Sequence, residues 1–145
     1  MKIAVVGGGI VGATCAYYLS KEQKNEIVVF DYGLGQATKA SAGIISPWFS
    51  KRRNKPWYKM ARLGADFYLK LVKDLEDDGY NTDFYSQCGV YLLKKNEDKL
   101  SELKELAESR KELSPMIGDL EIISKEEVRK IIPSFDNNGD VLYAS

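Results

Sequence analysis

The chain has 145 residues, of which 44% are hydrophobic and 29% charged, and this composition suits a globular protein with an apolar core. Its 21 basic and 21 acidic residues cancel, which disfavours nucleic acid as a partner because nucleic acid attracts excess Lys and Arg. The chain has no histidine and two widely spaced cysteines, Cys15 and Cys88, so we expect no metal site and no disulfide framework.

Both cysteines are expected to be small buried hydrophobes, and their scarcity favours a reducing, cytoplasmic location. No apolar run reaches the roughly 18–20 residues that a transmembrane helix needs. Peripheral membrane association and oligomerisation stay open at this stage.

The first 31 residues have the pattern of a strand, a helix and a second strand. Residues 2–6 are aliphatic except for Lys2, as in a parallel strand buried on both faces, and glycines end that run. Apolar residues at helical spacing predict a helix from Ile10 to about Lys21, and residues 27–30 predict a second buried strand. The fold class is therefore α/β, beginning with a Rossmann-like dinucleotide-binding βαβ unit with a right-handed crossover.

The remainder predicts mixed helices and strands. Residues 32–56 have little regular structure, and an amphipathic helix follows at 57–78. Ser124 and Glu127 have the pattern of a capping box, which begins a helix that must end before Pro133. The other expected elements are strands at 84–87, 90–94, 120–123 and 141–143, a helix at 97–113 and a turn at 136–139.

The sequence Gly7-Gly8-Gly9-Ile10-Val11-Gly12 fits the G-x-G-x-x-G pattern of dinucleotide-binding sites. Gly7 allows a tight turn out of the strand, Gly9 lets the backbone approach a pyrophosphate, and Gly12 lets helix and strand pack closely. The N-terminus of the helix then presents free N–H groups and a partial positive charge to the phosphates.

Asp31 ends the second strand, 19 residues beyond Gly12, where its carboxylate can accept hydrogen bonds from ribose hydroxyls. An acid here also disfavours the 2′-phosphate of NADP. The loop at 38–45, Thr38-Lys39-Ala40-Ser41-Ala42-Gly43-Ile44-Ile45, is small and polar and suits the distal part of a dinucleotide. A plain glycine turn with a flexible surface loop is the alternative interpretation.

Several segments together resemble the start of the FAD-dependent D-amino-acid oxidase family, which includes glycine oxidases, sarcosine oxidases and D-amino-acid dehydrogenases. They are residues 3–12, 16–19, 30–31, 40–43 and 88–92 and the Ser-x-x-Glu helix that ends in Ile131-Ile132-Pro133. Only the first 45 residues are specific. Asp31 departs from the family, where Glu is more common, but it keeps a carboxylate.

The resemblance implies FAD as cofactor and oxidation of the carbon–nitrogen bond of a small amino acid or secondary amine by hydride transfer to the flavin. The cofactor-binding residues it implies are Gly7, Gly8, Gly9, Ile10, Val11, Gly12, Asp31, Tyr32, Thr38, Ser41, Ala42, Gly43 and Ile44. It assigns no catalytic residue within the chain, because family members are well over twice as long. The chain is therefore expected to be the N-terminal part of such an enzyme and to be inactive by itself.

On this interpretation residues 1–47 form the FAD-binding βαβ unit with its flavin loop, and residues 48–80 add a long helix to it. Residues 81–145 begin a second, α+β substrate-side domain that the chain does not complete. An NAD-dependent dehydrogenase and a non-catalytic nucleotide-binding fragment are the two alternatives.

A basic cluster, Lys51-Arg52-Arg53-Asn54-Lys55, lies among the aromatic residues Trp48, Phe49, Trp57 and Tyr58. A solvated loop beside aromatic packing residues is the simpler interpretation. An anion site near the flavin is the functional alternative.

Overall fold

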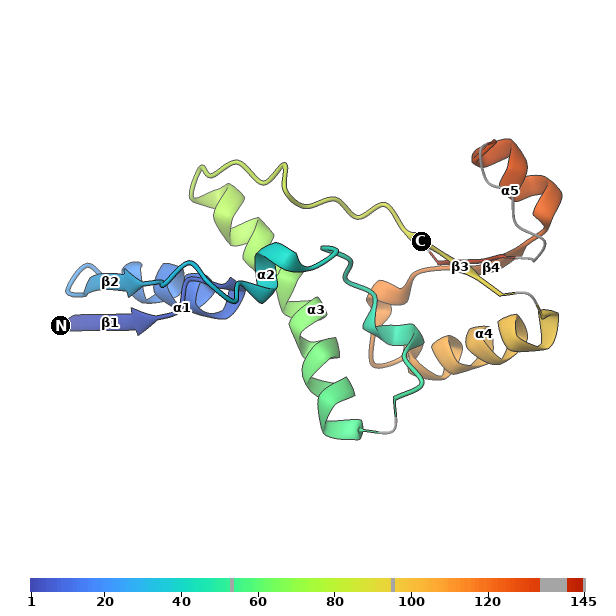
Figure 1. Cartoon of the computed structure of the whole chain (residues 1–145), viewed down its shortest axis with the longest axis horizontal. Coiled ribbons are helices and arrows are strands. Elements are labelled where there is room, and N and C mark those ends of the chain that lie inside the picture. Colours follow the sequence, from blue (N-terminus) through green and yellow to red (C-terminus); the bar gives the residue numbers. More distant parts are fainter. Residues whose placement is uncertain (53, 95, 134–140, 145) are drawn as a thin grey trace. The chain divides into compact units, whose positions relative to one another are not determined.

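The computed structural model of the chain describes residues 1–52, 54–94, 96–133 and 141–144. The chain forms two compact units, Met1–Ile45 (unit 1) and Ser46–Ser145 (unit 2), as Figure 1 shows.

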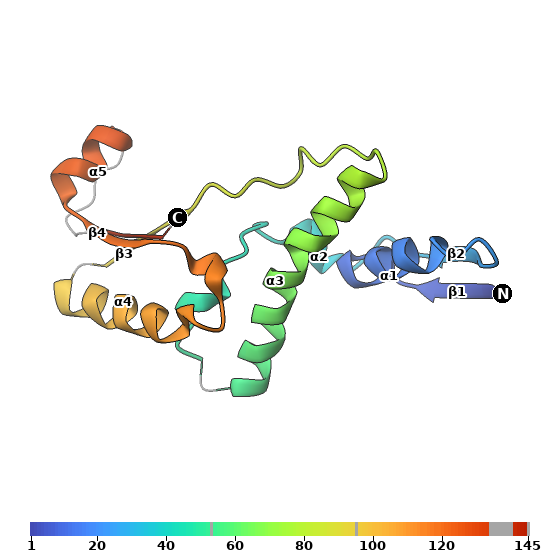
Figure 2. The same cartoon turned by 180° about the vertical axis from the view of Figure 1, so that it is seen from behind.

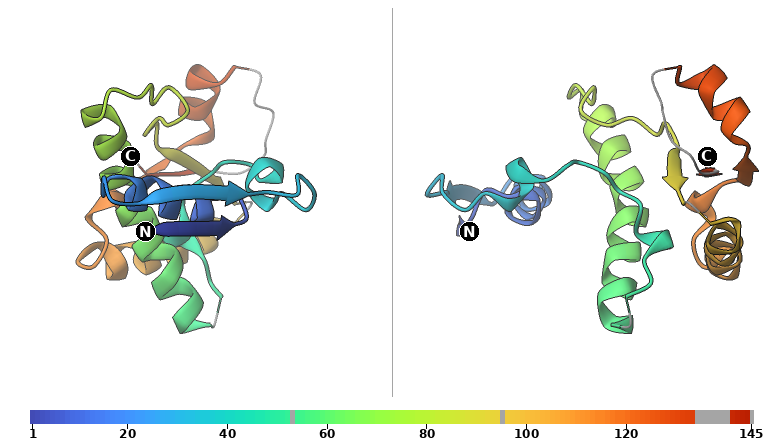
Figure 3. Two further views of the ribbon diagram at one scale, coloured as in Figure 1. Left: turned by 90° about the vertical axis from the view of Figure 1, so that its left-hand side faces the viewer. Right: turned by 45° about the vertical axis from the view of Figure 1, so that its right-hand side comes forward.

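Unit 1 is a strand–helix–strand unit followed by a loop. Its elements are β1 (Lys2–Val6), α1 (Ile10–Ser20), β2 (Glu26–Phe30) and the short helix α2 (Ala37–Ala40). The two strands are parallel, with Ile3 opposite Ile27 and Val6 opposite Phe30, and α1 lies against one face of them (Figure 3). The predicted βαβ unit is thus confirmed.

Burial in unit 1 is incomplete. None of its 45 residues is buried, and on the strands only Ile3, Val5 and Ile27 are even half-buried. These three side chains belong to the sheet face that α1 covers, since alternate residues of a strand share a face. Cys15 of α1 is exposed, so its predicted burial is wrong, because no second layer of unit 1 covers this helix.

Unit 2 contains a three-stranded antiparallel sheet in the order β3-β5-β4. Helices α4 and α5 lie on opposite faces of this sheet, and Figures 1 and 2 show this from both sides. The elements of unit 2 are η1 (Pro47–Phe49), α3 (Lys55–Asp77), β3 (Val90–Leu93), α4 (Glu97–Lys111), η2 (Pro115–Ile117), β4 (Leu120–Ile123), α5 (Lys125–Ile131) and β5 (Val141–Ala144).

The main core of unit 2 joins η1, α3, α4 and the sheet. Its buried members are Trp48, Phe49, Ala65, Leu100, Leu103, Ala107, Ile117, Leu120 and Ala144. A smaller cluster of Ile123 and Val128, flanked by Tyr91 and Tyr143, holds α5 on the other face. Helix α4 buries the predicted Leu100 and Leu103. Helix α3 buries Leu71 and Val72 of its predicted apolar stripe but leaves Trp57, Met60 and Phe67 exposed.

Helix boundaries in unit 2 follow local capping. Asn54 accepts a hydrogen bond from Trp57 N at 2.9 Å and begins α3. The predicted capping box is confirmed, because Ser124 accepts from Glu127 N and Glu127 accepts from Ser124 N. These bonds satisfy backbone donors that the first turn of a helix leaves free.

Two predictions for unit 2 are wrong, and one lies outside the described residues. Residues 84–87 form no strand, because Tyr85 N donates to Thr82 O at 2.9 Å and closes a turn instead. Cys88 is exposed, not buried, since it precedes β3 and belongs to no strand. The turn predicted at 136–139 falls in the segment that the structure does not describe.

Candidate functional site

The glycine turn joins the end of β1 to the start of α1. Gly7 has a φ of 98°, a left-handed conformation that favours glycine, and its N–H donates to Phe30 O at 2.7 Å. A Cβ on Gly12 would lie 1.9 Å from the carbonyl oxygen of Gly7. The first turn of α1 therefore packs directly on the turn that precedes it, and only glycine at position 12 allows this.

The Asp31 carboxylate lies against this turn. Its Oδ2 accepts a hydrogen bond from Gly8 N at 2.7 Å, and its Oδ1 accepts from Gly33 N at 2.8 Å and from Gln36 Nε2 at 3.4 Å. The bonds from Gly33 and Gly8, followed by that from Gln36, hold the pKa of Asp31 below its ordinary value, because each stabilises the charged form. Asp31 is thus a carboxylate at neutral pH.

Thr38 is the second side chain that reaches the glycine turn. Its Oγ1 accepts a hydrogen bond from Ile10 N at 3.0 Å, which is a donor at the N-terminus of α1. A Cβ on Gly9 would lie 3.2 Å from the same oxygen. Ser41 Oγ donates to Thr38 O at 2.9 Å, so the loop that carries both residues is held to itself as well as to α1.

The other residues that the sequence singles out are near neighbours in the chain but remain open to solvent. Val11, Tyr32 and Ile44 are 80%, 87% and 72% exposed. Ala42 is exposed as well, and Gly43 adopts a φ of 70°. The structure therefore brings Asp31 and Thr38 to the glycine turn, and it leaves the second half of the loop free to contact a ligand.

Sequence reasoning missed Gly33 and Gln36, which orient the Asp31 carboxylate. The available signal was the Asp-x-Gly spacing, because an aspartate side chain often accepts a bond from the backbone N–H two residues on. The hydrogen bond from Gly33 N holds Oδ1 of Asp31, so that Oδ2 faces Gly8 N.

The N-terminus of α1 brings a partial positive charge to the turn, next to the negative charge of Asp31. Helix α1 has 11 residues and carries no acidic side chain in its first turn, and its N-cap, Gly9, contributes no capping side chain. Backbone N–H groups at such a terminus attract phosphate through direct hydrogen bonds and the helix dipole. One carboxylate beside these donors can hold a sugar hydroxyl, since it accepts about four hydrogen bonds in all.

In unit 2 the basic cluster is engaged with its surroundings. Lys51 pairs with Glu102 at 2.6 Å, and the Arg52 guanidinium lies 4.6 Å from the centre of the Trp57 ring. Arg53 lies outside the described residues.

The neighbouring aromatic residues serve the core of unit 2. Trp48 and Phe49 are buried there. Arg110 donates to the carbonyl oxygens of Trp48 and Ser50 and lies 4.1 Å from the centre of the Tyr58 ring. These aromatic residues therefore contribute to the core of unit 2 and to contacts with Arg110.

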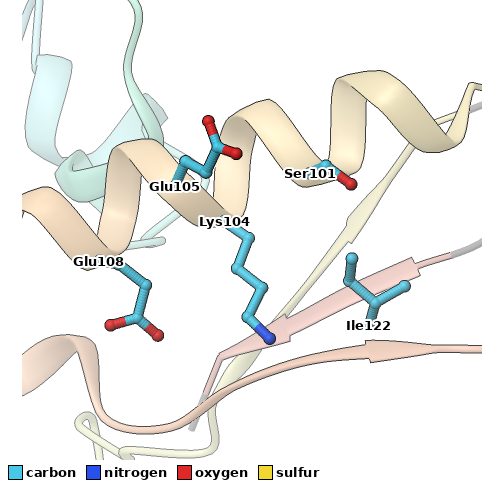
Figure 4. A pocket seen from close by; sticks show the side chains of 5 residues that line it. All are labelled: Ser101, Lys104, Glu105, Glu108 and Ile122. Carbon is cyan, nitrogen blue, oxygen red and sulfur yellow. The ribbon is translucent and has the colours of Figure 1, made fainter.

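Unit 2 also has an open groove of ≈ 450 Å³ between α4 and β4 (Figure 4). Its lining is Ser101, Lys104, Glu105, Glu108 and Ile122. The groove is lined by acidic and basic side chains and one apolar residue, Ile122, and no glycine belongs to its lining. Among the described residues there is no cluster of ligands for a metal ion, and no helix is long and apolar enough to cross a membrane.

Comparison with known proteins places this geometry in context. The family model described as FAD dependent oxidoreductase (DAO) matches residues 2–145. The chain is 40% identical over 141 residues to the uncharacterized oxidoreductase YurR of Bacillus subtilis, covering 97% of this chain and 38% of that protein. It is 29% identical over 146 residues to the glycine oxidase of Bacillus subtilis, covering 99% of this chain and 37% of the relative.

Solved structures share the fold. The crystal structure of iminodiacetate oxidase from Chelativorans sp. BNC1 superposes with a TM-score of 0.87 at 24% identity, over 99% of this chain and 38% of that one. Glycine oxidase from Bacillus cereus superposes with a TM-score of 0.70 at 20% identity, over 98% of this chain and 38% of that one. The chain thus spans less than two fifths of each of these four relatives.

Proposed function

This chain belongs to the family of FAD-dependent oxidoreductases of the DAO type, and from that premise we propose that residues 7–12, Asp31 and Thr38 bind the ADP half of FAD. The observation that carries the proposal is the Asp31 carboxylate, 2.7 Å from the backbone nitrogen of Gly8. In dinucleotide sites the pyrophosphate meets backbone at the helix N-terminus, and an acid after the second strand holds the ribose. Here the hydrogen bond from Gly8 N to Asp31 joins the phosphate-binding turn to the ribose-binding acid, so a single ligand would contact both the turn and Asp31.

The residues present fit the ADP group. A Cβ on Gly8 would lie 2.6 Å from Asp31 Oδ2, and a Cβ on Gly9 would lie 3.2 Å from Thr38 Oγ1, so glycine at these positions lets both side chains approach the backbone of the turn. The lowered pKa of Asp31 keeps it charged, and a charged carboxylate accepts hydroxyl donors strongly. We extend the site to Tyr32, Ser41, Ala42, Gly43 and Ile44 as contacts for the distal part of FAD, together with Val11 at the first turn of α1.

We further propose that the chain serves an enzyme that oxidises the carbon–nitrogen bond of a small amino acid or secondary amine, whose imine product hydrolyses in water. The names of two relatives, glycine oxidase and iminodiacetate oxidase, support this substrate class. Bound FAD would supply the acceptor for hydride. The contribution of residues 1–145 is to hold and orient the cofactor, and we assign none of them to proton transfer.

Nuclear magnetic resonance of the ¹⁵N-labelled chain tests the cofactor site directly. ADP at about 1–10 mM detects dissociation constants near the millimolar range, and we expect it to shift the amides of residues 7–12. FAD should shift these amides and also those of residues 38–44, whereas NAD should leave the loop unchanged. Shifts confined to other residues would refute the site, and equal loop shifts with NAD would favour the dehydrogenase alternative.

Variants of the acid sharpen this test. Asp31→Asn should weaken FAD binding by roughly ten- to hundredfold, because bonds to a charged acceptor contribute about 1.5–3 kcal/mol. Asp31→Glu restores a carboxylate and should recover most of the affinity. Asp83→Asn is the matched control, since Asp83 also accepts a side-chain hydrogen bond in an exposed turn, from Asn81 at 2.7 Å in unit 2. Equal affinity for all three variants would contradict the role of Asp31.

A further inference from the structure

The charged side chains of unit 1 are divided between the two ends of its parallel sheet. Lys2 and Glu26 lie at the start of β1 and β2 and form an ion pair at 3.3 Å. Lys21, Glu22 and Lys24 lie between α1 and β2 at the same end, where Lys24 Nζ is 3.8 Å from Glu22 Oε2. Most of the charged side chains of unit 1 are thus found where its strands begin.

The opposite end, where the strands lead into the glycine turn and the loop, has fewer charges. Residues 6–20 carry no charged side chain, and residues 30–45 carry only Asp31 and Lys39. Each strand has five residues and spans about 13 Å from its first to its last residue, which exceeds the Debye length of about 10 Å at 0.1 M salt. In unit 1, all of whose residues the structure describes, Lys39 is therefore the one cationic side chain at the end that carries the glycine turn.

Lys39 belongs to α2 and follows Thr38 directly. Thr38 Oγ1 accepts a hydrogen bond from Ile10 N at 3.0 Å, and Ser41 Oγ donates to Thr38 O at 2.9 Å. These bonds hold the backbone around Lys39 beside the N-terminus of α1. The Lys39 side chain is exposed, and its charge acts on the same site, because the pKa of Asp31 is lowered first by the hydrogen bonds described above and also by the positive charge of Lys39.

A bound pyrophosphate would add negative charge beside the negative Asp31. Helix α1 offsets this with only about half a positive charge at its N-terminus, and its first residues carry no basic side chain. An exposed ammonium offers three donors to phosphate oxygens. We propose that Lys39 binds the pyrophosphate through its ammonium group and neutralises part of its charge, an assignment that rests on the cofactor site proposed above. It adds to that site a residue that the glycine pattern does not contain.

Titration of the chain with ADP, and with adenosine as the ligand that lacks phosphate, tests the role of Lys39. Lys39→Gln should weaken ADP binding by about three- to tenfold at low salt, because a hydrogen bond to phosphate is lost. The variant should also show a weaker salt dependence of ADP binding, since salt screens a cation that it no longer has. Lys39→Arg keeps the charge and should bind ADP within about twofold of wild type. Adenosine should bind equally to wild type and both variants.

Lys24→Gln is the matched control, because it removes the same charge from an exposed lysine at the other end of the sheet. It should leave ADP binding and its salt dependence unchanged. Equal ADP affinity of Lys39→Gln and wild type would overturn the role of Lys39 and leave the cofactor site in place. The role is also overturned if Lys24→Gln loses as much affinity, or if Lys39→Gln loses adenosine and ADP in parallel. Absence of ADP shifts at residues 7–12 of the wild type would refute the cofactor site and this assignment together.

Discussion

Substitution of Gly12 by alanine tests the close packing on which the cofactor turn depends. The added Cβ would lie 1.9 Å from Gly7 O, 3.0 Å from Gly7 C and 3.4 Å from Val5 Cγ1, whereas real Cβ contacts are essentially never below 3.0 Å. Two of these atoms belong to backbone, so a side-chain rotation cannot relieve the clash. The start of α1 must move away from Gly7 by more than 1 Å, so that the distance from the new Cβ to Gly7 O rises from 1.9 Å to at least 3.0 Å.

The expected change in the stability of unit 1 is the difference between two opposing free-energy contributions. Overpacking costs about 1–3 kcal/mol, and replacing a helical glycine with alanine returns about 0.8–1.0 kcal/mol. We therefore expect Gly12→Ala to destabilise unit 1 by up to about 2 kcal/mol. Displacement of residues 8–10 should also lower FAD affinity by roughly three- to tenfold, because it misplaces the pyrophosphate although the N–H groups of Gly8 and Ile10 are already bonded within the protein.

Gly64→Ala is the matched control, because Gly64 lies inside α3 and an added Cβ there would meet nothing within 4 Å. This change should stabilise unit 2 by about 0.5–1 kcal/mol and leave FAD binding unchanged. Hydrogen exchange resolved by residue separates the two units, and flavin fluorescence gives the affinity. The reasoning is refuted if Gly12→Ala keeps wild-type exchange in β1 and α1, or binds FAD within twofold of wild type.

Three further predictions follow from the same contacts. The amide signals of Gly8 and Gly33 should titrate with Asp31 at a midpoint below the ordinary aspartate pKa of 3.8. A lowered pKa means that the charged Asp31 stabilises the turn fully above pH 3.8, and this stabilisation is lost as the pH falls through the midpoint. A midpoint at or above 3.8 in NMR spectra would contradict the hydrogen bonds described. Ser124→Ala should destabilise α5 by about 0.5–2 kcal/mol through loss of its N-cap, measured as faster exchange of its first-turn amides, and unchanged exchange would argue against the cap. Arg110→Lys should lower the free energy of unfolding of unit 2 by about 1.5–3 kcal/mol, because a lysine ammonium cannot reproduce the two hydrogen bonds that the planar guanidinium donates to Trp48 O and Ser50 O. A urea midpoint equal to that of wild type would exclude this role of Arg110 in stability.

Sequence reasoning succeeded where one pattern fixes one local structure. The glycine pattern specifies the strand–turn–helix because Gly7 needs a positive φ and Gly12 has no room for a Cβ. It failed where the outcome depends on neighbours that a pattern does not contain. Phe84 and Tyr85 favour a strand, but Tyr85 N closes a turn on Thr82 O, and residues 84–87 form no strand. Cysteine is usually a small buried residue, but Cys15 is exposed because unit 1 by itself covers little of α1.

The hydrogen bonds of the glycine turn limit how much FAD binding can gain from it. The N–H groups of Gly8 and Ile10 are already bonded, to Asp31 and Thr38. A phosphate that replaces either acceptor exchanges one hydrogen bond for another, so its net gain is smaller than the about 0.5–1.5 kcal/mol of a hydrogen bond formed by a hydrated donor. The Thr38 hydroxyl avoids this exchange, because it can accept from Ile10 N–H and donate its own proton to an anion at the same time. Tight binding therefore depends on contacts beyond the turn, and the turn chiefly sets where the pyrophosphate lies.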